Sequence, residues 1–421
     1  MKTLLSMSIM FGLFTLAHAK TSINSMCYRL DQPGSNMQGE HVGELFEIAS
    51  VSKVVTSYWA IRALDPNFKF STHIHITPVG SHFFDVHIQG SHDPFWGREM
   101  THFLFAQLNK IGVHEIRKLT FDENLIFRWS VISNYIDPIN PSFQEIAEAF
   151  HNHLKNLPKE YPKTHSEAAL LGLYLPKMLS LKAQSVAYLS SFDFKEESQT
   201  VTYALQSVPL YRYLKEMNSV SNNHVADHLF NYLGGPEKFK DFIQQDMNLN
   251  SKDIQFINGS GNSLTGINEN GESVKEYNKA SCDTMLRILF KVRAQLKKFG
   301  LDLKDVMAVA GTDEGTLKPR YDSLRNSLVA KTGTVDPAVT LAGVISTTQG
   351  NVYFGIFMET ESSADWSNAR DDIRQKVIEL MAQFGGRRSI SYRTRGFMPF
   401  DQDSGMIREI RQSQTQIKPK P

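Results

Sequence analysis

Three short polar motifs, far apart in the sequence, constrain the fold more strongly than any other feature of this chain. In order, they are Ser50-Val51-Ser52-Lys53, Ser221-Asn222-Asn223 and Lys331-Thr332-Gly333. Each alone occurs by chance in many chains of 421 residues, so the order and the local context carry the information. A fold that joins them must also accommodate the long segment between Lys53 and Ser221, which are 168 positions apart.

The sequence around the motifs predicts an α+β layered domain. Residues 51–64 have helical spacing and Pro66 stops them, which places Ser50 at a helix start. Strand-like runs occupy residues 327–331, 339–346 and 352–359. Amphipathic helices are expected at residues 222–232, 281–299 and 366–384. Antiparallel strands with helices before and after them are typical of this fold class.

Between the first two motifs the pattern changes, which predicts an inserted accessory domain of mixed α and β structure. Residues 70–76 alternate, 83–89 form a short β-like run, and 98–111 are an amphipathic helix ending at Gly112. We therefore expect one domain from residues 20–66 and 205–390, an insert at 67–204, and a solvated C-terminal tail at 391–421.

Residues 1–19 read as a signal peptide, with Lys2, an apolar run and an Ala17-His18-Ala19 cleavage site. A retained membrane anchor is the alternative. Since no second apolar stretch of about 20 residues occurs, we expect export to the periplasm or medium without a stable membrane span. Cys27 and Cys282 are the only cysteines, and a single disulfide and buried free thiols remain equally open.

Charge and histidine patterns exclude two classes of ligand. The chain has 45 Lys and Arg against 44 Asp and Glu, so nothing indicates nucleic-acid binding. His73 and His75 share a strand face upstream of His82, His87 and His92, and His151 and His153 form another pair. Because no carboxylate or cysteine stands in ligand spacing, we expect no metal and no cofactor, and a solvent-exposed histidine face.

The three motifs together match the S-x-x-K, S-x-N and K-T-G set of penicillin-binding proteins and serine β-lactamases. Residues three apart share a helix face, so Lys53 can reach back to Ser50. A serine hydroxyl needs a base, and a lysine serves as one when burial or positive charge lowers its pKa. We therefore expect Ser50 as nucleophile and Lys53 as its base.

The other motif residues have expected roles in the same chemistry. Ser221 would pass the proton to the leaving amine, and Asn223 would hold Lys53 and a substrate amide. Lys331 and Thr332 would face the substrate carboxylate from an edge strand, and Gly333 would let the substrate backbone lie close. Backbone N–H groups of Ser50 and Thr334 would form the oxyanion hole.

Longer stretches resemble the class C penicillin-binding proteins, the D-alanyl-D-alanine carboxypeptidase/endopeptidase group. Residues 217–227 are similar to its M-N-x-x-S-D-N-x-x-A-E, 258–263 to its D-G-S-G-L-S, and 308–318 to its V-A-G-x-x-G-T-L-K. Residues 331–334 with 341–343 match K-T-G-T and L-A-G, and 89–94 resemble its G-x-G-D-P turn.

This resemblance implies a transpeptidase-like domain that hydrolyses D-alanyl bonds in peptidoglycan stem peptides and cross-links through an acyl-enzyme, and that binds β-lactams. The insert is short for the group, which implies an open cleft that favours cross-linked substrate. Asn222 and Asn258 stand where the group has Asp, and Asn262 replaces an apolar residue. These departures concern local hydrogen bonding and substrate preference.

Two other functions share part of this pattern. A β-lactamase would share the first and third motifs, but the chain has no E-x-x-L-N stretch and carries a large insert. A catalytically weak homologue that binds peptidoglycan without efficient cleavage is the main alternative, although none of the catalytic side chains is lost. The sequence does not indicate whether the protein prefers endopeptidase or carboxypeptidase cleavage. It also leaves open the oligomeric state and whether the target is the cell's own wall or that of another cell.

Overall fold

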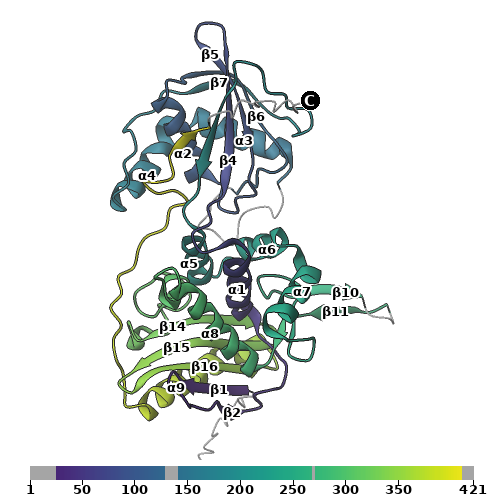
Figure 1. Cartoon of the computed structure of the whole chain (residues 1–421), viewed down its shortest axis with the longest axis vertical. Coiled ribbons are helices and arrows are strands. Elements are labelled where there is room, and N and C mark those ends of the chain that lie inside the picture. Colours follow the sequence, from purple (N-terminus) through teal and green to yellow (C-terminus); the bar gives the residue numbers. More distant parts are fainter. Residues whose placement is uncertain (1–24, 129–140, 268–270, 410–421) are drawn as a thin grey trace, which may run out of the picture.

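An antiparallel sheet of six strands forms the base of the lower lobe in Figure 1. The computed structural model describes residues 25–128, 141–267 and 271–409. The strand order is β13-β14-β15-β16-β1-β2. These strands are β1 (Ser25–Leu30), β2 (Gln38–Glu40), β13 (Ala308–Val309), β14 (Leu328–Val335), β15 (Ala338–Thr347) and β16 (Gly350–Glu359). The three strands predicted from the sequence are confirmed as β14, β15 and β16.

Both faces of this sheet are covered at β14, β15 and β16, so these three strands are buried almost throughout. Side chains on a strand alternate between faces. Phe354 and Ile356 of β16 pack with α9 (Trp366–Gln383), while Tyr353 and Phe357 pack with α8 (Cys282–Lys297) and α1 (Ser52–Leu64). All three helices were predicted from the sequence, and each is confirmed to within a few residues.

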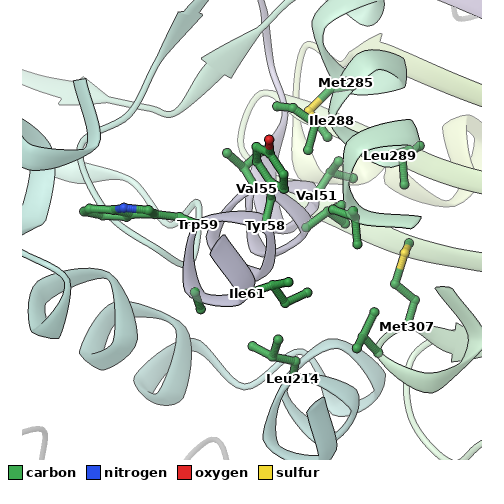
Figure 2. Packing of buried hydrophobic residues seen from close by; sticks show 14 of the residues in the cluster. Val51, Val55, Tyr58, Trp59, Ile61, Leu214, Met285, Ile288, Leu289 and Met307 are labelled. Atoms are coloured by element: carbon green, nitrogen blue, oxygen red, sulfur yellow. The ribbon is translucent and has the colours of Figure 1, made fainter. Parts of the chain in front are cut away.

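Helix α1 runs through the middle of the lower lobe and is buried on nearly every side. Residues 52–61 are all buried, which explains why this helix lacks a polar face. Figure 2 shows Val55, Tyr58 and Trp59 pointing into the surrounding apolar cluster. The helices packed around α1 include α5 (Leu210–Val220), α6 (Asn223–Tyr232) and α8. The first turn of α1, where two motif residues lie, is therefore held from several directions.

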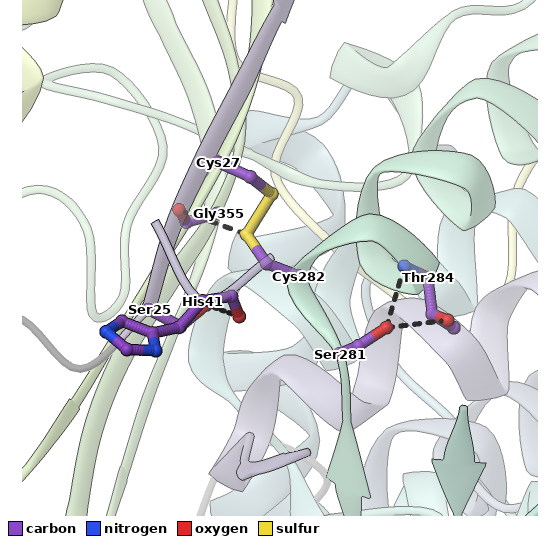
Figure 3. Close-up of a disulfide and its surroundings, with 7 residues drawn as sticks. All are labelled: Ser25, Cys27, His41, Ser281, Cys282, Thr284 and Gly355. Atoms are coloured by element: carbon purple, nitrogen blue, oxygen red, sulfur yellow. Dashed lines mark hydrogen bonds between the residues drawn. A yellow bond between two sulfur atoms is a disulfide. The ribbon is translucent and has the colours of Figure 1, made fainter. Parts of the chain in front are cut away.

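A disulfide joins Cys27 of β1 to Cys282 at the start of α8, so the paired alternative holds (Figure 3). The two residues are 255 positions apart. Ser281 caps α8 by accepting a hydrogen bond from the backbone N–H of Thr284. Gly355 lies beside the bridge, where a Cβ would come within 2.8 Å of Cys282 Sγ. The disulfide thus fixes the first strand to the helix layer above the sheet.

A second sheet forms the upper lobe in Figure 1, which we call the accessory lobe (Ser71–Gln206). Its order is β17-β8-β4-β5-β6-β7, with parallel pairing only for β5-β6 and β6-β7. The strands are β4 (Ser71–Val79), β5 (Phe83–Gln89), β6 (Glu115–Phe121), β7 (Lys182–Tyr188), β8 (Val201–Gln206) and β17 (Met406–Arg408). Its helices are α2 (Arg98–Lys110), α3 (Phe143–Lys155) and α4 (Leu157–Leu170). The lobe has its own apolar core.

Smaller elements complete the lower lobe. Three short strands pair as β3-β12-β9 near the nucleophile motif. A protruding hairpin follows the 258–263 segment, and α7 follows α6 (Figure 1). Their bounds are β3 (Phe46–Glu47), β9 (Ile254–Gln255), β10 (Leu264–Ile267), β11 (Ser273–Glu276), β12 (Lys279–Ala280) and α7 (Gly235–Met247).

The segment after residue 390 differs from the expected solvated tail. It runs from the lower lobe to the accessory lobe, where Met398 and Phe400 are buried and the ring of Phe400 stacks on Phe103 at 4.3 Å between centroids. It then adds β17 to the edge of the second sheet by pairing with β8. The solvated tail was expected because the segment is rich in Lys and Arg, but its few apolar residues anchor it to the lobe. Residues 410–421 lie outside the described part.

The signal-peptide prediction, residues 1–19, also lies outside the described residues. Within the described part of the chain, no helix has the length and apolar character needed to cross a membrane.

Candidate active site

Ser50 lies in a single 3-10 turn, Ala49–Val51, that leads directly into α1. Ala49 before it has φ of 48°, a left-handed conformation that costs energy in a residue with a side chain. Gly261 packs so closely on this turn that a Cβ there would lie 1.9 Å from the Ala49 carbonyl oxygen. The turn that presents Ser50 is therefore held in place by residues 258–261, which belong to the stretch that resembles the D-G-S-G-L-S pattern of the group.

Lys53 is fully buried beneath Ser50, one turn along the helix. Its Nζ lies 2.9 Å from Ser50 Oγ, and it donates hydrogen bonds to Asn223 Oδ1 at 2.6 Å and to the Ser260 carbonyl oxygen at 2.9 Å. Burial lowers the pKa of Lys53 to about 7, and the nearby Asp227 carboxylate opposes this shift. After deprotonation, two N–H groups can still serve the two carbonyl oxygens, and the lone pair faces Ser50 Oγ.

Ser221 lies at the junction of α5 and α6, in a left-handed conformation with φ of 60°. The next residue, Asn222, caps α6 by accepting a hydrogen bond from the Val225 backbone N–H. Asn222 therefore performs a capping role that Asp also performs, and the departure from the group at this position leaves the turn intact. Asn223 then opens α6 and points its carbonyl oxygen at Lys53.

Lys331 on β14 donates hydrogen bonds to Ser221 Oγ at 2.9 Å and to the Thr332 carbonyl oxygen at 2.8 Å. Its side chain is 1% exposed. Burial, with the positive charges of Lys53 and Arg320, lowers the pKa of Lys331 well below its usual value. The four polar groups thus form two hydrogen-bonded pairs, Lys53 with Ser50 and Lys331 with Ser221.

The β14 edge is open where the third motif begins. β13 pairs only with Val329 and Ala330, so none of the described strands pairs with β14 on that side from Lys331 onward, as an edge strand requires. Gly333 has a different constraint from the one expected: a Cβ there would lie 2.2 Å from Thr340 Oγ1 and 2.9 Å from Ala49 Cβ. Glycine is thus required by packing against the nucleophile turn.

A cleft of about 350 Å³ joins these groups. It is lined by Ser50, Val220, Ser221, Asn223, Asn262, Thr316, Arg320, Thr332, Thr334, Trp366 and Arg370. Of the predicted site residues, Ser50, Ser221, Asn223, Thr332 and Thr334 line the cleft itself. Lys53 and Lys331 lie beneath it in contact with the two serines, and Gly333 contacts the nucleophile turn.

Sequence reasoning did not single out Arg320, Trp366 and Arg370, which line the cleft together with Thr334. Arg370 Nη2 donates to Thr334 Oγ1 at 3.3 Å, and its guanidinium lies over the Trp366 ring. Burial and the Arg370 charge lower the pKa of Arg320. Within the described residues, neither guanidinium forms an ion pair with a carboxylate. The sequence signals for these residues are weak. Arg320 lies two residues after the 308–318 stretch, and Trp366 and Arg370 are linked only by the i,i+4 spacing that places them on one helix face.

The expected solvent-exposed histidine face is wrong for two of its members, whereas His73 is partly exposed and His82 is exposed. His75 and His87 are buried, and their rings lie 4.7 Å and 3.9 Å from the Phe194 ring. His75 also pairs with Glu196 at 3.0 Å. These contacts lie in the accessory lobe.

A sequence model of the D-Ala-D-Ala carboxypeptidase 3 (S13) family matches residues 34–131 and 168–380. No curated protein matches the chain.

Three solved structures illustrate the range of similarity. The predatory peptidoglycan endopeptidase Bd3459 of Bdellovibrio bacteriovorus is 34% identical with a TM-score of 0.83, over 93% of this chain and 100% of that one. The predatory endopeptidase Bd0816 of the same organism, solved with immunity protein Bd3460, is 32% identical with a TM-score of 0.81, over 92% and 100%. Penicillin-binding protein 4 (dacB) of Haemophilus influenzae shares the fold, with 16% identity and a TM-score of 0.57 over 86% and 98%.

Proposed function

The chain belongs to the D-Ala-D-Ala carboxypeptidase 3 (S13) family, and from this premise we propose that Ser50 is the nucleophile of its peptidase reaction. The protein is a serine DD-peptidase that acts on peptidoglycan and binds β-lactams. One observation carries the assignment to Ser50: the buried Lys53 Nζ lies 2.9 Å from Ser50 Oγ. The same contact argues against a catalytically weak binding homologue, since the nucleophile and its base are both in place.

The first half of the reaction follows from these contacts. Lys53 in its neutral form takes the proton of Ser50 Oγ as this oxygen attacks the D-alanyl carbonyl carbon. The backbone N–H groups of Ser50 and Thr334 stabilise the oxyanion that forms. Collapse of the tetrahedral intermediate breaks the C–N bond, and the leaving amine takes a proton from Ser221, which Lys331 holds in place. Ser221 in turn takes the proton that Lys53 removed from Ser50, so Lys53 is neutral again when the amine departs. The products are the free amine and an ester on Ser50.

Water then attacks the ester carbon, with Lys53 again accepting a proton. The new carboxylate leaves and the proton returns to Ser50 Oγ, which restores the enzyme. Both steps need a neutral Lys53, so the depressed pKa of this lysine serves the whole cycle. Asn223 keeps Lys53 oriented in both halves by accepting its hydrogen bond.

We assign the carboxylate next to the scissile amide to Thr332, Thr334 and the two arginines. Arg320 and Arg370 place unpaired positive charge at the cleft, and charged hydrogen bonds to a carboxylate are strong. A cross-link and a terminal D-alanine both carry a carboxylate at this position. The arrangement therefore suits either cleavage and does not rank them.

Of the two cleavages, we propose that endopeptidase action on cross-links is the preferred one. Solved relatives of this chain at 34% identity carry the name endopeptidase, and they match it over their whole length. Within the described residues, the segment between the first two motifs forms a single lobe around one sheet. Faster cleavage of dimeric than monomeric muropeptides would support this ranking, and equal rates would contradict it.

The site of action lies outside the cytoplasmic membrane, where peptidoglycan is found. We propose that the expected signal peptide, residues 1–19, directs this export and that residues 20–66 with 205–390 form the catalytic domain around the insert. The Cys27–Cys282 disulfide supports an oxidising destination. Amino-terminal sequencing of secreted protein beginning at Lys20 would support cleavage after Ala19.

Labelling with a fluorescent penicillin tests the nucleophile. The wild-type protein should be labelled and Ser50→Ala should not. Ser52→Ala is the matched control, since its hydroxyl is buried two residues away and makes no hydrogen bond. Equal labelling of Ser50→Ala would overturn the assignment, and a folded wild type that takes no label would favour the binding homologue.

A further inference from the structure

Three helices of the accessory lobe bring two histidines and a glutamate together. His102 comes from α2, His153 from α3 and Glu160 from α4. One nitrogen of each imidazole and one carboxylate oxygen of Glu160 all lie within 4.8 Å of one another. His102 is 0% and His153 is 9% exposed. The group belongs to the lobe core, separate from the residues that line the catalytic cleft.

The hydrogen bonds of the two imidazoles leave ring nitrogens without partners. His102 Nδ1 bonds to Thr164 Oγ1 at 2.8 Å, and His153 Nδ1 bonds to Glu160 Oε2 at 3.0 Å. The Nε2 atom of each ring is buried and has no hydrogen-bond partner. Buried polar atoms without partners cost free energy and are rare in native proteins. Two such atoms on adjacent rings, 5.5 Å apart between centroids, call for a ligand.

The charge state of the cluster suits a cation. Both imidazoles are buried, and burial disfavours the positively charged form of a histidine. A neutral imidazole keeps one nitrogen lone pair for coordination. Glu160 adds a negative charge, whereas the charges of Glu99 and Arg98 nearby offset each other in an ion pair.

We propose that His102, His153 and Glu160 bind a Zn²⁺ ion that joins α2, α3 and α4. Two imidazoles and a carboxylate are a common three-residue ligand set for zinc, with water in the fourth position. Zinc–ligand distances of about 2.0–2.2 Å put donor atoms about 3.3 Å apart, so rotations that move the side chains by about 1–2 Å close the site. The Glu160 side chain is 35% exposed, which gives the ion a route from solvent.

This site departs from the expectation of no metal, and the reason is spacing. In the sequence the nearest histidine to His153 is His151, two positions away on α3, but His151 is exposed in the structure. The histidine that lies next to His153 is His102, which is 51 positions earlier in the chain. No local ligand spacing marks such a site, because each ligand comes from a different helix.

Metal content of the full chain tests the proposal. After equilibration with Zn²⁺ and removal of excess ion, the wild type should retain about one zinc per chain by mass spectrometry. His153→Gln and Glu160→Gln should each retain less than about a fifth of that. His151→Gln is the matched control on the same helix and should bind like the wild type.

Thermal unfolding supplies the second measurement. Zinc should raise the midpoint of the wild type by about 5 °C over the chelator-treated protein, and it should not raise that of Glu160→Gln. If His153→Gln fails to fold, the partly exposed Glu160 variant still decides the question. A wild type that retains no zinc, or variants that retain as much as the wild type, would overturn the site. Penicillin labelling at Ser50 reports the peptidase function separately.

Discussion

Lys331 Nζ lies 2.9 Å from Ser221 Oγ, which ties the edge strand β14 to the turn between α5 and α6. Lys331 forms no ion pair with any described carboxylate, and Lys53 adds a second buried amine nearby. Two buried amines in one site disfavour each other's protonation. Ser221 is therefore placed to donate its proton outward while Lys331 fixes the direction of its hydroxyl.

Ser221→Ala should slow acylation by about 10²–10⁴-fold, because the leaving amine loses its proton donor. The measurement is the rate of acyl-enzyme formation with a penicillin and with a peptide substrate. Ser219→Ala is the matched control, since this buried hydroxyl two residues earlier makes no hydrogen bond. A loss smaller than threefold in Ser221→Ala would remove Ser221 from the proton path.

Acylation should depend on pH through Lys53. Its pKa of about 7 lies below the usual value, and only the neutral amine accepts the Ser50 proton. The acylation rate should therefore rise tenfold per pH unit below about 7 and level off above it. Asp227→Asn removes the nearby carboxylate that favours the charged form, so the inflection should move to lower pH. An inflection that stays in place would contradict the role of this carboxylate.

Arg370→Gln should weaken recognition of the substrate carboxylate. Charged hydrogen bonds of this kind contribute about 1.5–3 kcal/mol, so the preference for a free carboxylate over an amidated substrate should fall about 10–100-fold in kcat/KM. Arg374→Gln, one turn along α9 and paired with Asp371, should keep the wild-type preference. Equal preferences in all three proteins would place the carboxylate elsewhere.

Gly333→Ala should lower stability and activity together. The added Cβ would meet Thr340 Oγ1 and Ala49 Cβ, which forces the strand away from the nucleophile turn. We expect a loss of about 1–3 kcal/mol in the free energy of unfolding and slower acylation. Gly43→Ala has open space around it and should behave like the wild type in denaturant titrations.

Loss of the disulfide should destabilise the lower lobe. The bridge closes a loop of 255 positions, and native disulfides typically contribute about 2–4 kcal/mol. The Cys27→Ser, Cys282→Ser double variant should unfold at lower denaturant concentration than the oxidised wild type. The reduced wild type should unfold at the same denaturant concentration as the variant. If reductant also shifts the unfolding midpoint of the variant, the effect has a cause other than this disulfide.

Much of the lower lobe was predictable because its signals are local. Helix α1, the strands β14 to β16 and the motif residues follow from spacing, breakers and the family pattern around them. Arg370 and Trp366 could not be found this way, since they reach the cleft from a helix that follows the last strand of the sheet. The packing of Phe400 on Phe103 and the meeting of His102 with His153 depend on long-range contacts that no short window contains.

The pairing of β1 with β16 sets the order in which this chain can reach its final form. β1 lies between β2 and β16, yet Cys27 faces Gly355 across the ladder, more than 300 positions later. A ribosome delivers the first strand long before its partner exists, so the sheet that carries Lys331 stays incomplete until synthesis is nearly finished. Contacts this distant in sequence also slow folding. A chain that ends before β14 therefore lacks both Lys331 and the strand that pairs with β1.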